Sequence, residues 1–332
     1  MRPTLVLGVL LGTIALSSGC GIVIGLDKIK PRLSADSGAS DPLGSDASTV
    51  ADAATASDGA VLPTDASADG APCTACECPQ SCATRFTTDT HWTVPPGCMA
   101  VTVLAWGAGG GAGFTNASQG GAGGFVQGTF DTQPGQHLEI FVGRAGASAV
   151  SGAAGGAPGG GQGGMGTNGG GGGGGLSGVF VNFLPARGTA IVVAGGGGGG
   201  AGEGANDGAG LGGGGIAGQL GGLRAGGSGT SGGGGDGAGN GTAGGDPNGG
   251  NGGAGPCGGG GGGAGIFGGG GGASDQGGTC GGGGGGAGYV SSAVRGTDFQ
   301  VGNAGLPANY KDPRCQGAGY AGADGAVLIT CN

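Results

Sequence analysis

Residues Gly258 to Ala287 read GGGGGGAGIFGGGGGASDQGGTCGGGGGGA, and this stretch decides what kind of fold the chain can have. Glycine has no side chain to bury, and it loses more backbone entropy on ordering than any other residue. An ordinary hydrophobic core cannot be built from such runs. The glycine-rich part must therefore be disordered or be held by backbone hydrogen bonds.

Similar runs recur over a large part of the chain, in which 103 of the 332 residues are glycine. They are Gly169 to Gly175, Gly195 to Gly200, Gly258 to Gly263, Gly268 to Gly272 and Gly281 to Gly286. Such runs can adopt the polyproline II conformation, and packed side by side they can hydrogen bond to one another. Collagen would need a glycine at every third residue with abundant proline, and neither is present. The runs therefore predict a bundle of polyglycine II helices.

Short apolar segments with strand patterns bracket the glycine runs. Thr90 to Trp106 is expected to form a strand, because β-branched and apolar residues alternate after the Pro96-Gly97 turn. Further strands are expected at Gly124 to Phe130, His137 to Val142, Val179 to Leu184, Ala190 to Ala194, Gly288 to Ser292 and Gly325 to Cys331. Short strands separated by turns predict an all-β fold, a β-sandwich.

The first residues have the pattern of an export signal: Arg2, an apolar run from Leu5 to Leu16, then small residues before Cys20. They resemble a bacterial lipoprotein processing site, which implies a signal peptide over 1–19 and a lipid on Cys20. Ser17 stands where that family usually has an apolar residue. Cleavage without lipid and an uncleaved membrane anchor are the alternatives. The resemblance also favours the outer membrane, because Gly21 and no Asp follows the cysteine.

Three segments separate the signal from the glycine-rich module. Residues 20–33 are membrane-proximal, and residues 34–72 are an Ala/Ser/Asp linker with almost no large apolar residues, for which we predict disorder. Residues 73–98 form a Cys-rich segment that leads into the first strand. The module itself is expected at 90–332.

Nine cysteines remain after Cys20, and in an exported chain they are expected to form disulfides, so that at least one is left over. They are Cys73, Cys76, Cys78, Cys82, Cys98, Cys257, Cys280, Cys315 and Cys331. A zinc or iron–sulfur site in the first four is the alternative to a small disulfide knot. Cys257 and Cys280 border glycine runs and suggest a bridge between adjacent glycine helices, and Cys98 could join the first strand to Cys331 in the last. The connectivity stays open.

The order of these motifs resembles a known family. The motifs are Thr93 to Gly97, Val101 to Gly111, Gly123 to Phe130, Pro134 to Gln136, Val142-Gly143, Gly170 to Val179, Val193 to Gly200 and Gly322 to Ile329. Together they resemble the glycine-rich domain of bacterial and phage surface proteins, and they are similar to the extracellular glycine-rich region of anaplastic lymphoma kinase receptors. The resemblance implies a jelly-roll-like β-sandwich with an inserted bundle of polyglycine helices. It also implies a receptor-binding or adhesive ectodomain.

Several motifs suggest catalysis or cofactor binding but lack the required context. Gly107 to Ala112 follows a strand, as a dinucleotide-binding turn would, but no helix-forming segment follows it. Gly229 to Gly233 matches G-x-S-x-G without a strand and helix around it. His91 and His137 are the only histidines, and we interpret both as ordinary surface or core residues. Asp207, Asp236 and Asp246 fit no calcium repeat and are expected in solvated loops.

Charge and composition narrow the function. The formal net charge is −9, with three lysines and eight scattered arginines, so we expect no nucleic-acid partner. We expect no enzyme, no cofactor and no metal. The leading hypothesis is a lipid-anchored surface protein that binds an extracellular protein or glycan. A purely structural envelope or matrix component is the alternative, and an enzyme that uses His91 or His137 is disfavoured.

Overall fold

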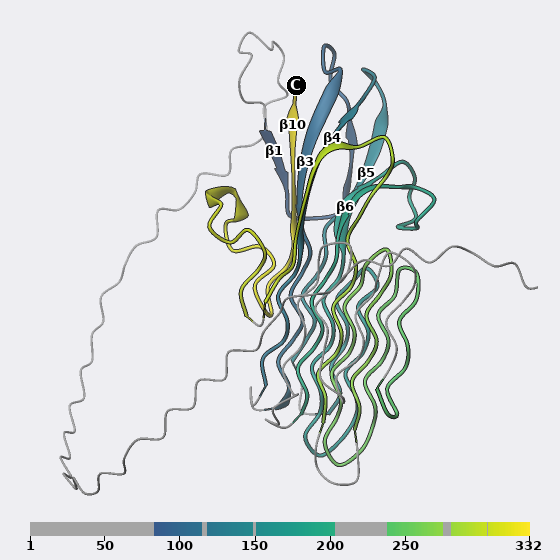
Figure 1. Cartoon of the computed structure of the whole chain (residues 1–332), viewed down its shortest axis with the longest axis vertical. Coiled ribbons are helices and arrows are strands. Elements are labelled where there is room, and N and C mark those ends of the chain that lie inside the picture. The colour runs from purple at the N-terminus through teal and green to yellow at the C-terminus, as the bar shows by residue number, and fades with distance from the viewer. Residues whose placement is uncertain (1–82, 115–117, 149–150, 203–237, 275–279, 304) are drawn as a thin grey trace, which may run out of the picture. The chain divides into compact units, whose positions relative to one another are not determined.

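The computed structural model describes residues 83–114, 118–148, 151–202, 238–274, 280–303 and 305–332. In these ranges the chain forms ten strands in two antiparallel sheets and almost no helix (Figure 1). This confirms the expected all-β class. The described part contains no helix long and apolar enough to cross a membrane.

The two sheets have five strands each, and every strand pairing is antiparallel. The first sheet has the order β1 (Ala83–Phe86), β10 (Ala326–Cys331), β3 (Ala100–Trp106), β4 (Phe125–Asp131) and β9 (Arg295–Gln300). The second has the order β2 (Thr90–Thr93), β5 (His137–Phe141), β6 (Ser177–Phe180), β7 (Ala190–Ala194) and β8 (Tyr289–Val290). The last strand in sequence therefore lies between the first and the third.

One hydrophobic cluster draws its side chains from both sheets. Val101 and Val103 of β3 are fully buried in it, together with Ile140 of β5 and Val192 of β7. Alternation explains this, because every second residue of a strand points to the same face. Burial of each such side chain contributes about 1.5–3 kcal/mol, so a few strands suffice for a core.

The glycine-rich segments extend from one end of the sheets as long, extended stretches of chain that lie side by side (Figure 1). Their backbone hydrogen bonds repeat every third residue, and successive residues bond to different neighbouring segments. In the segment after β7 the bonds are Gly196 N–H to Ala264 O, Gly199 N–H to Gly261 O, Gly197 N–H to Ala108 O and Gly200 N–H to Gly111 O, at 2.7 to 2.9 Å. The backbone groups of these segments are thus satisfied by other segments.

Glycine is required at most of these positions because the backbones approach very closely. A Cβ placed on Gly198 would lie within 3.0 Å of the Gly283 carbonyl group. Real Cβ atoms do not come so close to backbone atoms. Ala264 shows the exception, since it points into the apolar cluster of Leu176, Phe180 and Val193 beside the second sheet.

Two cysteine pairs lie at disulfide distance. Cys98 is bonded to Cys331 with a Cα–Cα distance of 5.5 Å, and Cys257 is bonded to Cys280 at 6.1 Å. Both pairings agree with the expectations from sequence. Cys315 is buried and has no disulfide partner among the described residues, so its predicted disulfide stays a prediction. Cys20, Cys73, Cys76, Cys78 and Cys82 lie outside the described residues.

The strand predictions need four corrections. The range Thr90 to Trp106 forms two strands, β2 and β3, which lie in different sheets. Strands β1 and β9 were not predicted, because both are edge strands with largely exposed residues and little apolar alternation. Strand β1 also places folded structure ahead of residue 90, inside the expected Cys-rich segment. The apolar run Val179 to Leu184 is only partly strand: β6 ends at Phe180, and Phe183 and Leu184 lie exposed in the following loop.

Candidate binding site

The connection between β9 and β10, residues 301–325, forms a separate excursion beside the first sheet. It packs on the sheet through Ala308, Cys315 and Ala318, which are buried in a cluster with Leu104, Trp106, Phe125 and Leu328. Trp106 and Phe125 are fully buried, and their ring centroids lie 5.1 Å apart. The excursion is therefore attached to the fold by an apolar base.

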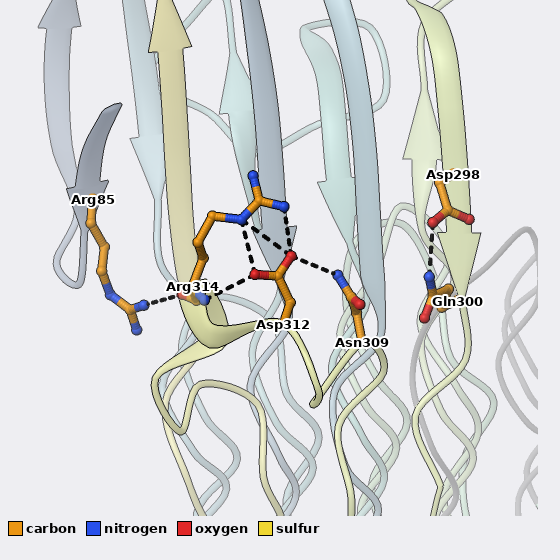
Figure 2. A network of polar contacts seen from close by, with 6 residues as sticks. All are labelled: Arg85, Asp298, Gln300, Asn309, Asp312 and Arg314. Atoms are coloured by element: carbon orange, nitrogen blue, oxygen red, sulfur yellow. Dashed lines mark hydrogen bonds and ion pairs between the residues drawn. The ribbon is translucent and has the colours of Figure 1, made fainter. Parts of the chain in front are cut away.

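A carboxylate holds the 3-10 turn η2 (Pro313–Cys315) within the excursion (Figure 2). Asp312 is the N-cap of η2, and its side chain accepts hydrogen bonds from the Arg314 backbone N–H at 2.9 Å and from the guanidinium Nη2 at 2.6 Å. Asn309 Nδ2 donates to the same carboxylate at 3.3 Å. The hydrogen bonds from Arg314 lower the pKa of Asp312, so the carboxylate form is favoured.

A second basic side chain ties the excursion to the first strand. Arg85 of β1 donates from Nη1 to the Arg314 carbonyl oxygen at 2.6 Å (Figure 2). It also donates from Nη2 to the Cys315 carbonyl oxygen at 3.2 Å. These are charge-assisted bonds to carbonyl groups at the end of η2. Gln300 and Asp298, also drawn in Figure 2, form a separate pair on β9 at 2.8 Å.

The end of the excursion is held by another acidic residue. Asp324 accepts hydrogen bonds from the Ala145 backbone N–H at 2.8 Å and from Arg144 Nη1 at 3.0 Å. The Arg144–Asp324 ion pair is about half exposed, so it contributes at most about 1 kcal/mol. The bond from Ala145 still fixes the excursion against a neighbouring segment.

A cavity of about 410 Å³ lies between the excursion and the glycine-rich segments. Ala112, Gln119, Gly120 and Ser148 line it from the glycine-rich part. The excursion contributes Gly305, Tyr320, Ala321 and Gly322. No charged side chain is among these eight lining residues. Their side chains include a phenol, a carboxamide and a hydroxyl group.

A smaller cavity of about 300 Å³ is lined by Phe130, Asp131, Gln136, Val181 and Ile191, among others. Phe130 and Ile191 belong to the core cluster, so the bottom of this cavity is apolar. Asp131 pairs with Arg295 at 2.7 Å. Its polar lining residues are Asp131, Gln136, Thr189 and Ser291.

The two histidines lie together on the second sheet but at neither cavity. His91 is opposite Glu139, and Thr93 is opposite His137, so alternation places the four side chains on one face. The His137 ring Nδ1 is 3.0 Å from the Thr93 hydroxyl. No group of three or more potential metal ligands occurs in the described part of the chain.

The other sequence motifs have structural roles where they can be followed. In Gly107 to Ala112 each backbone N–H is hydrogen bonded to another protein group, for example Gly107 to Gly124 O at 2.9 Å. Burial raises the pKa of Asp246, and the charge of Arg187 opposes this shift. Gly229 to Gly233, Asp207 and Asp236 lie outside the described residues.

The sequence did not indicate the larger cavity. Its residues come from segments around positions 112–120, 148 and 305–322, and none of them forms a recognisable motif. Tyr320 and Gln119 carry no signal in a single sequence that separates them from surface residues. A comparison of the chain with protein-family models and with curated proteins gives no match.

Proposed function

We propose that this chain is a surface-displayed protein, lipid-anchored through Cys20, with a binding or adhesive role and no catalytic one. The order of the sequence segments supports it: an export signal, an acidic linker rich in Ala and Ser, then the glycine-rich module. A lipid would hold the chain at an outer membrane, and the linker would separate the module from it.

The finer architecture that we propose is a jelly-roll-like β-sandwich with an inserted bundle of polyglycine II helices. The three-residue period of the inter-segment hydrogen bonds supports this, because a polyglycine II helix has about three residues per turn. The close approach at Gly198 and at similar positions supports it as well. Such a bundle would be a stiff support for the loops and cavities at its surface.

The observation that carries the binding role is the larger cavity. Its wall on the excursion side is fixed by the apolar base, by Asp312 and by Asp324, so the site is largely formed before any ligand arrives. A preformed site loses less entropy on binding. The chemistry of the lining residues, a phenol, an amide and a hydroxyl group, fits hydrogen-bonded recognition.

A purely structural envelope or matrix component is the second candidate. The extensive hydrogen bonding between glycine segments and the Cys257–Cys280 bridge favour a rigid spacer as well. In that case the cavity would have no ligand.

Two experiments test the proposal. Radiolabelled palmitate should enter the wild-type protein, and a Cys20→Ser variant should leave the membrane fraction; a variant that stays bound would overturn the anchoring. Protein and glycan arrays should then show reproducible binding by the full chain. No binding on either array, together with ordered self-assembly of the protein, would favour the structural candidate.

A further inference from the structure

We propose that the larger cavity binds an uncharged saccharide unit, with Tyr320 and Gln119 as its main contacts. This inference rests on the proposed binding function and names the class of ligand. The cavity volume of about 410 Å³ lies within the range of small-molecule sites, which is about 300–1,000 Å³.

The absence of charge among the eight lining residues restricts the ligand. A phosphate, sulfate or carboxylate group would find no arginine, lysine or histidine among them. A cationic ligand would find no carboxylate there either. The nearby charged side chains of Arg144 and Asp324 are already paired with each other. The ligand should therefore be neutral, because an ion desolvated without a partner is costly.

The hydrogen-bonding groups of the cavity indicate a ligand rich in hydroxyl groups. The Tyr320 hydroxyl and the Gln119 carboxamide have no hydrogen-bond partner among the described residues. The Ser148 hydroxyl oxygen already accepts from the Ala112 backbone N–H at 2.8 Å but can still donate. A carboxamide has donors and an acceptor, and hydroxyl groups can both donate and accept. The three side chains thus match a polyhydroxyl ligand, whereas a purely apolar ligand would leave them desolvated.

Tyr320 also supplies an apolar surface. An aromatic ring buries a large area at a low cost in side-chain entropy, and its hydroxyl group can keep a polar contact at the same time. A saccharide ring has C–H groups on its faces and hydroxyl groups at its edge, so it can use both properties at once. Gly322, whose Cβ position meets no atom within 4 Å, leaves the neighbouring space open.

The test uses the purified full chain and a panel of named saccharides. The neutral members are methyl glucoside, methyl galactoside, methyl mannoside and N-acetylglucosamine, with their trisaccharides. The charged members are galacturonic acid, N-acetylneuraminic acid and glucosamine. Saturation-transfer NMR detects binding, and titration calorimetry gives the Kd. We expect binding of at least one neutral saccharide at millimolar or lower concentration and no binding of the charged ones.

Variants locate the site. Tyr320→Ala should weaken neutral-saccharide binding at least tenfold, and Gln119→Ala should weaken it several-fold. Tyr310→Ala is the matched control, because Tyr310 belongs to the same excursion and is exposed but does not line the cavity. Near-UV circular dichroism checks that each variant is folded, and if Tyr320→Ala is not, Gln119→Ala decides.

The possible outcomes separate this inference from the broader proposal. No binding of any neutral saccharide overturns the inference, and so does binding that the cavity variants leave unchanged. If the protein arrays show a ligand while the saccharides fail, the proposed binding role stands without this site. If all arrays are silent, the binding role fails as well.

Discussion

Replacement of Gly198 by alanine tests whether backbone packing between glycine segments stabilises the module. The new Cβ would meet the carbonyl group of Gly283 within 3.0 Å, and backbone cannot rotate away as a side chain can. If the neighbouring segment retreats, the bond from Gly283 N–H to Gly199 O, now 2.8 Å, is lost. The bond from Gly121 N–H to Gly198 O, now 2.7 Å, is distorted as well. Each buried backbone group left unsatisfied costs about 1–3 kcal/mol, so we expect a loss of about 4 kcal/mol.

Gly245→Ala is the matched control for this experiment. A Cβ at Gly245 meets no atom within 4 Å, and its backbone angle φ is not in the left-handed region. The free energy of unfolding of this control should equal that of the wild type or exceed it by about 0.5 kcal/mol, because alanine restricts the unfolded chain. Denaturation in guanidinium chloride with intact disulfides, followed by tryptophan fluorescence, gives the two free energies. If Gly198→Ala and Gly245→Ala agree within about 1 kcal/mol, the close packing argument is refuted.

Three further predictions follow from the disulfides and titratable groups. Cys331→Ser should lower the free energy of unfolding by about 5 kcal/mol and Cys280→Ser by about 3 kcal/mol, because the two bridges close loops of 233 and 23 residues. If Cys280→Ser lowers the denaturation midpoint as much as Cys331→Ser or more, this prediction is wrong. Arg314 lowers the pKa of Asp312 in the folded state, so the ionised carboxylate contributes to the free energy of unfolding above the unfolded pKa of about 3.9. This contribution is lost as the pH falls through the folded pKa. Asp312→Asn should therefore flatten the acid side of a plot of stability against pH, and an unchanged acid side would contradict the prediction. Burial raises the pKa of the Cys315 thiol, so iodoacetamide should label its peptide at pH 8 only after unfolding, and rapid labelling of the native protein would be inconsistent with this burial.

The sequence predicts the inner strands well because they are short, largely buried runs of apolar and β-branched residues. The ranges expected around Val101 to Trp106 and Ala190 to Ala194 agree with β3 and β7 closely. Edge strands such as β9 are not predicted from the sequence, because their exposed residues need no apolar pattern. The neighbouring strand decides their pairing. At Phe183 the sequence predicts a strand where the structure has a loop, because an apolar residue need not be buried.

The candidate site was not predictable for a different reason. Tyr320 becomes part of a cavity only because the excursion is folded back by Asp324 and by the apolar base, and both of these contacts join residues distant in sequence. Arg85 shows this most clearly, since its two carbonyl partners lie 229 and 230 residues further along the chain. No local pattern records such contacts.

The rare residues that interrupt the glycine runs have a specific structural role. A segment whose hydrogen bonds repeat every third residue could slide by three residues and recover the same kind of bonds, so glycine alone does not fix its position. The runs that end at Gly175, Gly263 and Gly286 are followed by Leu176, Ala264 and Ala287. All three of these side chains are buried in the same cluster beside the second sheet. A slide by three residues would withdraw them from the cluster and push a Cβ into the closely packed backbones, so both apolar burial and steric exclusion select one register. The hydrogen bonds between glycine segments therefore stabilise their packing, whereas the buried apolar residues at the ends of the runs specify their register.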